Sequence, residues 1–346
     1  AIQQSYFTYL AIQNTGVETI MLAYDNKTPT FQLFDIQVNS INPENTDTLI
    51  KSLQGVDTII FTSLIPTQKS FVTILKRNNI ELIYQICGNY YIINQEDFVF
   101  NCHQRKFYET TSLVDKIWLL PMYEHMKSYI ETITKVPVYI APYVWNADIV
   151  ESSNVHNVWP QNMVPKSSTL KISNQNKHVV LIAEPNVSIH KTALIPSLIC
   201  ENIEYKNKIF MLCSKENTSF NYLLSKLDIY KNIDFHNRLV VVKVLQQIIG
   251  NNILPFVVSH QILNELNFLH LEMLYFGIPL VHNCNMLKPS GFFYPDHDVN
   301  LGGEQLKTAI NNFNFNDYKQ KCDLVLSEFN PKNPRVIETY KNLLGI

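Results

Sequence analysis

The chain has 346 residues, of which 46% are hydrophobic and 17% are charged. This length exceeds one typical core and suits two domains of ordinary size, and the composition excludes a disordered chain. The formal net charge of −2 comes from interspersed acidic and basic residues, which argues against an extended nucleic-acid footprint.

The spacing of the cysteines and the length of the apolar segments indicate in which cellular compartment the protein is expected. The six cysteines lie far apart and form no C-x-x-C pair, so we expect reduced thiols rather than a disulfide framework. No apolar stretch approaches the roughly 20 residues that a membrane-spanning helix needs, and no signal peptide opens the chain. These features predict a cytoplasmic protein without a membrane span.

The first 150 residues alternate between helical and strand patterns. The opening segment, AIQQSYFTYLAIQNTG, has apolar residues near helical spacing and ends at Gly16. Because an α/β domain normally begins with a strand, we expect the first strand of this domain to be missing or to lie upstream of residue 1. The predicted strands that follow are 17–25, 31–39, 57–64, 80–87, 115–120 and 136–145. The predicted helices are 46–56, 68–79 and 123–134.

A polar segment at 151–176 contains two prolines and no sustained period, so it is the predicted linker. The alternation of strands and helices then restarts. The predicted strands of the second half are 178–185, 208–214, 232–237, 253–260 and 278–283. The predicted helices are 190–203, 219–230, 240–250 and 267–277, and the tail adds 302–313, 316–329 and 334–345.

Strands that alternate with helices imply βαβ units and parallel sheets. We therefore predict an α/β protein with two Rossmann-like domains, one spanning residues 1–150 and the other 177–330. The remaining helix, within 331–346, is expected to pack back on the N-terminal domain.

The most informative segment is SHQILNELNFLHLEMLYFGIPLVHN, residues 259–283. A buried strand ends in polar residues here, and ligands of open α/β sheets bind outside the carboxyl ends of the strands. Asn264 is the predicted N-cap of the helix that follows, and the free N–H groups of its first turn would suit a diphosphate. Glu272 can accept hydrogen bonds from both hydroxyls of a ribose.

Several other chemistries lack their motifs. The sequence contains neither G-x-x-x-x-G-K-[ST] nor G-x-G-x-x-G, which are the common phosphate-loop signatures. It contains no H-E-x-x-H metal motif and no G-x-S-x-G nucleophile elbow. Basic residues also do not interleave with aromatic ones as a nucleic-acid groove would require.

The pattern E-x-x-x-x-G-x-P-L-V at 272–281 resembles the donor-site signature of retaining GT-B glycosyltransferases, in the manner of glycosyltransferase family 4. In that family two glutamates are separated by seven residues; the second binds the nucleotide ribose and the first approaches the donor sugar. Glu272 matches the second glutamate. Asn264 occupies the position of the first, with Glu265 beside it, so the match at the sugar contact is incomplete.

A second resemblance covers nearly the whole chain. The segments that carry it are, in order, YQICGNYYI, KIWLLP, VPVYIAPYVW, AEPNVSIHKTALIP, VVSHQILNELNFLHLE, GIPLVHN and GFFYPDHD. They are similar to a poorly characterised family of bacterial and giant-virus proteins of unknown function with a GT-B-like fold. The asparagine-rich composition suits a giant virus, for which the compartment would be the host cytoplasm.

These resemblances imply a nucleotide-sugar site in the C-terminal domain. Lys191 resembles the basic residue that neutralises the donor diphosphate, and GT-B enzymes generally need no metal, so we expect no cofactor. No residue stands out as nucleophile or base, and the catalytic candidates are His260 and Glu265. The predicted nucleotide-sugar-binding residues are Glu184, Asn186, Lys191, Ser259, His260, Asn264, Glu265, Asn267 and Glu272.

Residues of the N-terminal domain are predicted to face the acceptor. Gly88, Asn89 and Tyr90 follow a buried strand. Trp145 ends another strand and could stack on a sugar ring, with packing between domains as an equal alternative.

We therefore predict transfer of a sugar from a nucleotide-sugar donor to an unidentified hydroxyl acceptor on a glycan, a protein or a small molecule. The donor signature favours retention of the anomeric configuration. The alternatives are a nucleotide-sugar epimerase-like enzyme and a non-catalytic GT-B-like binding protein.

Overall fold

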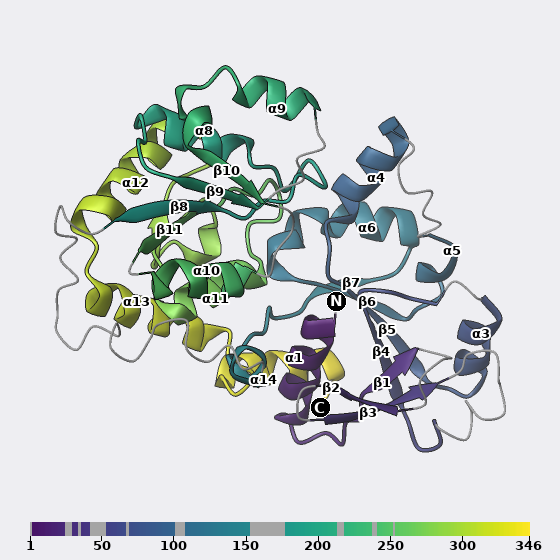
Figure 1. Ribbon diagram of the computed structural model, residues 1–346. Helices are drawn as coiled ribbons and strands as arrows, with labels where there is room; N and C mark the ends of the chain where they lie inside the picture. Colours follow the sequence, from purple (N-terminus) through teal and green to yellow (C-terminus); the bar gives the residue numbers. More distant parts are fainter. Residues whose placement is uncertain are drawn as a thin grey trace. The chain divides into compact units, whose positions relative to one another are not determined.

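The chain forms two compact α/β units (Figure 1). Unit 1 comprises residues 1–149 and 329–346, and unit 2 comprises residues 150–328. The predicted linker lies outside the described residues from 153 onward, and the predicted helix at 46–56 lies outside them up to 52. The computed structural model describes residues 2–24, 30–33, 36–41, 53–66, 69–100, 108–152, 177–212, 218–236, 241–251 and 253–346.

Unit 1 contains two sheets among its described residues. Its strands are β1 (Leu22–Tyr24), β2 (Thr30–Leu33), β3 (Ile36–Ile41), β4 (Thr58–Thr62), β5 (Glu81–Ile86), β6 (Lys116–Leu119) and β7 (Val138–Ile140). Four of them form a parallel sheet in the order β4-β5-β6-β7. The inner strands β5 and β6 are almost wholly buried, as expected for parallel strands that are covered on both faces.

The other sheet of unit 1 has the order β1-β3-β2 and differs from the prediction. A single strand over 31–39 was wrong, because this stretch holds parts of β2 and β3, which pair antiparallel. Two strands of a hairpin carry the same alternation of apolar and polar residues, so the pattern alone does not reveal the reversal between them. Of the described residues in the strand predicted over 17–25, those of β1 form a strand, and 17–21 do not.

The helices of unit 1 support the parallel sheet. α1, the predicted opening helix, ends before Gly16, whose φ of 91° suits a glycine. α14 packs beside α1, and Tyr340 on α14 places its ring 5.7 Å from that of Trp118 on β6 (Figure 1). The C-terminal helix therefore belongs to unit 1. The helices are α1 (Ile2–Gln13), α3 (Lys69–Arg77), α4 (Tyr90–Phe100), α5 (Tyr108–Thr111), η1 (Pro121–Met126), α6 (Lys127–Thr134) and α14 (Pro334–Leu344), and α7 (Asp148–Ser152) crosses the boundary between the units.

Unit 2 is built on one six-stranded parallel sheet. Its strands are β8 (His178–Ile182), β9 (Ile209–Leu212), β10 (Ile233–His236), β11 (Leu254–Val258), β12 (Leu280–His282) and β13 (Phe292–Phe293). Their spatial order is β10-β9-β8-β11-β12-β13. Numbered from the first strand of the unit, this is the order 3-2-1-4-5-6 of a doubly wound nucleotide-binding sheet. The direction of winding reverses between β8 and β11, which is where such sheets bind ligands.

Helices cover both faces of this sheet, with α8 and α12 on one side and α10 and α11 on the other (Figure 1). α12 approaches α8 closely because it carries Gly302 and Gly303 where the two helices meet. A Cβ atom on Gly302 would lie 2.6 Å from Cδ1 of Ile199, a fully buried residue of α8. The helices of unit 2 are α8 (Leu194–Asn202), α9 (Thr218–Leu224), η2 (Asp228–Asn232), α10 (Val241–Gly250), α11 (Phe268–Phe276), η3 (Asn285–Leu287), α12 (Val299–Asn312) and α13 (Phe315–Glu328).

The contact between α8 and α12 generates a stability prediction. Gly302→Ala should destabilise unit 2 by about 1–3 kcal/mol in urea unfolding, because overpacking outweighs the higher helix propensity of alanine. Gly250→Ala is the matched control, since no atom lies within 4 Å of a Cβ at that helical position. Ile199→Val should restore part of the loss in the Gly302→Ala background. If both alanine variants are equally stable, the two helices are not in close contact.

Candidate functional site

The candidate site lies at the carboxyl ends of four strands of unit 2. Glu184 follows β8, Ser259 and His260 follow β11, Asn283 follows β12 and Tyr294 follows β13. All five residues are buried, with exposed fractions between 0% and 7%. Buried polar side chains of this kind require hydrogen-bond partners, and here they find them largely in each other.

Glu184 and Ser259 are hydrogen-bonded to each other across the point where the winding of the sheet reverses. The Ser259 hydroxyl donates to Oε1 of Glu184 and also lies 2.8 Å from Nε2 of His270 on α11. Because this hydroxyl has one proton, Nε2 of His270 is the donor in the second bond when Glu184 is ionised. Burial lowers the pKa of His270 well below its usual value, so this donor is a neutral imidazole.

The Glu184 carboxylate is buried among neutral donors. Its Oε2 atom lies 3.5 Å from Nε2 of Gln261, which donates to it. Burial raises the pKa of Glu184 from 4.5 to about 7, while the Ser259 hydrogen bond and the charge of Lys191 act in the opposite direction. Both oxygens of the Glu184 carboxylate therefore have partners inside the protein, and the ligand contact expected from the sequence stays a prediction.

Gln261 extends the network to the loops that follow β11 and β12. Its Oε1 atom accepts from Nδ2 of Asn264 at 2.7 Å. Its backbone N–H donates to Oδ1 of Asn283 at 3.0 Å, and its carbonyl accepts from Nδ2 of the same residue at 2.8 Å. Asn283 therefore clamps both backbone groups of Gln261, and the ends of β11 and β12 are held as one surface.

The helix that follows β11 begins later than predicted. α11 starts at Phe268, and its N-cap is Asn267, whose side chain accepts from the His270 N–H at 3.1 Å. The prediction of Asn264 as the N-cap was wrong, because its side chain is engaged with Gln261 instead. Glu265 lies in the intervening loop, where Oε2 accepts from the backbone and side-chain nitrogens of Asn285.

Glu272 on α11 differs from the other acidic residues of the site. Glu272 is half-buried; this burial raises its pKa from 4.5 to about 7, and no neighbouring charge or hydrogen bond from the described residues offsets it. A carboxylate without compensation is costly to bury, and such groups occur preferentially at functional sites.

Lys191 and Asn186 lie in the loop between β8 and α8. Lys191 pairs with Ser188 in a short bridge, and its charge acts on both Glu184 and His270. The Lys191 ammonium therefore lies on the same edge of the sheet as the buried network. Lys191 does not begin a helix, as was predicted, because α8 starts at Leu194; Asn186 accepts from the Ala193 N–H at 2.7 Å just before that start.

The start of α8 also explains its proline. Pro196 is the third residue of the helix, so it lies in the first turn, where a backbone N–H has no partner within the helix. The helix predicted over 190–203 was therefore too long at its amino end.

His260 and Tyr294 form a second buried pair. Nδ1 of His260 lies 2.9 Å from the Tyr294 hydroxyl, which in turn lies 3.2 Å from the Ser259 carbonyl. The ring of His297, an exposed residue, lies 4.8 Å from that of His260 between centroids. Sequence reasoning did not single out His270 or His297; a histidine among apolar residues, as in FLHLEMLYF, was the available signal for the first.

The predicted acceptor-side residues belong to unit 1. Oδ1 of Asn89 accepts from the Ile92 N–H and so caps α4, a helix that the prediction missed. The Tyr90 hydroxyl lies 2.6 Å from that of Tyr84. Trp145 is 4% exposed, and its backbone N–H donates to the Phe329 carbonyl. Gly88 is partly exposed in the turn before α4. A role in acceptor binding stays a prediction for these residues.

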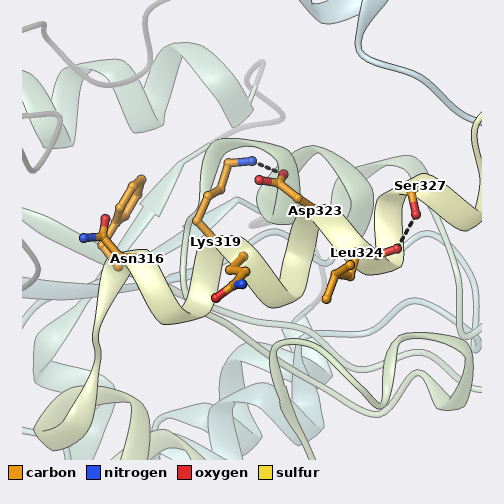
Figure 2. A pocket seen from close by; sticks show the side chains of 7 residues that line it. Asn316, Lys319, Asp323, Leu324 and Ser327 are labelled. Atoms are coloured by element: carbon orange, nitrogen blue, oxygen red, sulfur yellow. Dashed lines mark hydrogen bonds and ion pairs between the residues drawn. The ribbon is translucent and has the colours of Figure 1, made fainter.

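A groove of about 480 Å³ lies elsewhere in unit 2, along α13 (Figure 2). Three of its polar side chains have partners: Lys319 pairs with Asp323, and the Ser327 hydroxyl donates to the Leu324 carbonyl (Figure 2). This groove therefore offers little for a polar ligand. Within the described ranges, no group of three metal-ligating side chains occurs, and no helix has the length and apolar character to cross a membrane.

The fold is that of GT-B glycosyltransferases. A glycosyltransferase from Rickettsia africae ESF-5 matches with a TM-score of 0.60 at 13% identity, covering 99% of this chain and 94% of that one. The apo form of WaaB, a lipopolysaccharide outer core galactosyltransferase, matches with a TM-score of 0.56 at 10% identity, covering 99% and 95%. Anabaena Alr3699/HepE in complex with UDP-glucose matches with a TM-score of 0.51 at 10% identity, covering 88% and 86%.

The chain belongs to the DUF2827 family, which is described as a family of proteins of unknown function. The family model matches residues 3–344. No curated protein matches the sequence.

The buried network generates a prediction with a defined pH dependence. Ser259→Ala removes a donor from the ionised Glu184 carboxylate, so it should cost about 1–3 kcal/mol of unfolding free energy at about pH 8.5. Because the folded-state pKa of Glu184 is about 7, the carboxyl group is protonated at about pH 5.5, and the loss should be smaller there.

Ser197→Ala is the control for this experiment. Ser197 is also fully buried, and its hydroxyl donates to the Ala193 carbonyl at 2.7 Å, a group that does not titrate. Its loss should be the same at both pH values in urea unfolding. A loss for Ser259→Ala that does not change with pH would show that Glu184 is not ionised in this network.

Proposed function

We propose that the protein is a glycosyltransferase that binds a nucleotide-sugar donor at the carboxyl edge of the sheet in unit 2. The observation that carries this proposal is the polar cluster at the ends of β8, β11, β12 and β13, on the two sides of the point where the winding reverses. A sheet with this strand order binds nucleotides at that point. The likeness to glycosyltransferases, one of them with UDP-glucose, supports a donor of the same class.

The diphosphate of the donor would lie between Lys191 and the start of α11. The N–H groups at the start of α11 and its helix dipole favour an anion. The Lys191 charge acts on His270, which is in the first turn of the same helix. Together these groups would stabilise the negative charge that develops on the leaving diphosphate.

Glu272 would bind the ribose. Its carboxylate is desolvated without compensation, and the two hydroxyls of a ribose are the donors that it lacks. The E-x-x-x-x-G-x-P-L-V pattern around it also ends in elements that fix the site: Gly277 is the left-handed C-cap of α11, and Leu280 begins β12.

Transfer with retention of configuration is part of the proposal and rests on the donor signature alone. His260 and Glu265 remain the candidates for a group that contacts the reacting sugar. Neither an epimerase-like enzyme nor a non-catalytic binding protein is favoured by these observations.

Binding of nucleotides is the first test. In a thermal-shift screen against UDP, GDP, ADP, CMP and their sugars, one nucleotide should stabilise the protein, by about 2.7 kcal/mol at a hundredfold excess over Kd. Lys191→Ala and Glu272→Ala should abolish the shift. Lys206→Ala is the matched control, because Lys206 pairs with Glu204 at an exposed position before β9, at the end of the strands opposite to the candidate site. A wild-type protein that binds none of these ligands would overturn the proposal.

Replacing Glu272 should have opposite effects on the stability of the protein and on its affinity for nucleotides. A carboxyl group with a raised folded-state pKa is protonated in the folded protein and ionised in the unfolded chain between about pH 4.5 and 7, so its contribution to stability falls as pH rises through that window. Glu272→Gln removes this cost and should raise the unfolding free energy by about 1–3 kcal/mol at about pH 8.5.

Near pH 4.5 the wild-type carboxyl group is protonated in the folded state, so Glu272→Gln should leave the unfolding free energy unchanged there. The same substitution should weaken nucleotide binding about tenfold or more. Urea unfolding at the two pH values and titration calorimetry measure both effects. Equal stability of the two proteins at high pH would show that Glu272 is solvated, and the ribose contact would then lack its physical basis.

A further inference from the structure

Hydrogen bonding fixes which nitrogen of His260 carries the proton. The Tyr294 hydroxyl has one proton and two neighbours, Nδ1 of His260 at 2.9 Å and the Ser259 carbonyl at 3.2 Å. A carbonyl can only accept, so both bonds form only if Tyr294 donates to Ser259 and accepts from His260. If Tyr294 donated to His260 instead, the buried Ser259 carbonyl would lose the hydrogen bond from Tyr294, which costs free energy. His260 is therefore protonated on Nδ1.

Nε2 of His260 is consequently a bare acceptor. Burial lowers the pKa of His260 from 6.5 to about 4, so the ring is neutral at physiological pH and Nε2 carries no proton. The side chain is 1% exposed, and no donor among the described residues reaches Nε2. The ring of the exposed His297 lies against that of His260, 4.8 Å between centroids, so a surface side chain adjoins this buried imidazole.

An unprotonated nitrogen recognises a donor and rejects an anion. It cannot bind the oxygens of a diphosphate, which are acceptors, but it can accept a hydrogen bond from a hydroxyl. The proposed donor has hydroxyls on its ribose and on its sugar, and the ribose hydroxyls are those that Glu272 would bind. We propose that Nε2 of His260 accepts a hydrogen bond from a hydroxyl of the donor sugar, with His297 displaced when the sugar binds.

This inference rests on the proposed function, and it makes His260 a residue that distinguishes the sugar nucleotide from the bare nucleotide. Tyr294 is a positioning residue, because its hydroxyl holds the proton of His260 on Nδ1 and so keeps Nε2 open. Tyr294 is itself fixed by full burial and by its bond to the Ser259 carbonyl.

The test compares UDP with UDP-glucose, or the nucleotide pair that the binding screen selects, on the full chain by titration calorimetry. His260→Asn is the informative variant, because its side-chain amide can still donate to Tyr294 while nothing replaces Nε2. It should weaken UDP-glucose binding about tenfold and leave UDP binding unchanged. Lys191→Ala should weaken both ligands, since both carry the diphosphate.

Tyr294→Phe tests the positioning role. It should lower the affinity for UDP-glucose but not for UDP, and nitrogen NMR of the imidazole should change from one tautomer, protonated on Nδ1, to a mixture. Tyr318→Phe is the matched control: Tyr318 is another buried tyrosine of unit 2, its hydroxyl donates to the Ile278 carbonyl at 2.9 Å, and it should change neither readout.

Three results would overturn the inference. Equal weakening of UDP and UDP-glucose by His260→Asn would place His260 at the diphosphate, the ribose or the base. A wild-type imidazole protonated on Nε2 would remove the acceptor. A wild-type protein that binds neither ligand would overturn the proposed function as well, whereas the first two results leave nucleotide binding intact.

Discussion

Unit 2 buries a carboxylate where the winding of its sheet reverses, and the arrangement of the neighbouring loops follows from the need to pair it. Glu184 ends the first strand of the unit, and its partners Ser259 and Gln261 follow the fourth. Gln261 is in turn held by Asn264 and Asn283. A buried polar network is stable only if its members are satisfied, so each bond constrains the next. The loops after β8, β11 and β12 thereby become one preorganised surface.

Not every polar group in this part of the molecule finds a partner among the described residues: Nδ2 of Asn186, Nδ1 of His270 and Nε2 of His260 lack one. Glu272 is desolvated without a compensating charge, and Nε2 of His260 has no donor among the described residues. One is an acceptor on a helix and the other an acceptor at a strand end, so both would be satisfied by a ligand that carries hydroxyls. Polar groups that lack partners cost stability and occur preferentially at functional sites, which is why the proposed donor is placed here.

The sequence predicted the strands of unit 2 well because buried parallel strands are continuous apolar runs that end in polar residues, as in ILPFVVSH before Gln261. It also predicted that Ser259 follows the strand now seen as β11. It did not predict which asparagine caps α11, because Asn264 and Asn267 are equally suited by residue type. The choice depends on Gln261, whose side-chain oxygen accepts a hydrogen bond from Asn264. Asn267 is then the residue that accepts from the His270 N–H and caps the helix.

Other structural features cannot be predicted from the local pattern of residues in the sequence. The tautomer of His260 depends on Tyr294, which lies 34 residues further along the chain. In unit 1, α4 follows β5 almost at once, and its cap at Asn89 is an ordinary polar residue after a strand. The antiparallel pairing of β2 and β3 is a tertiary outcome that alternation alone cannot specify. Long-range partners, rather than residue types, decide such details.

Hydrogen exchange measured with and without a saturating nucleotide sugar tests the central claim most directly, because it locates the ligand without any substitution. The account predicts slower exchange in the segments 183–193, 259–274 and 283–297, with no change at 204–208, which precede β9. Binding that protects other parts of the chain and leaves these three segments unchanged would contradict a donor site at the carboxyl edge of the sheet in unit 2.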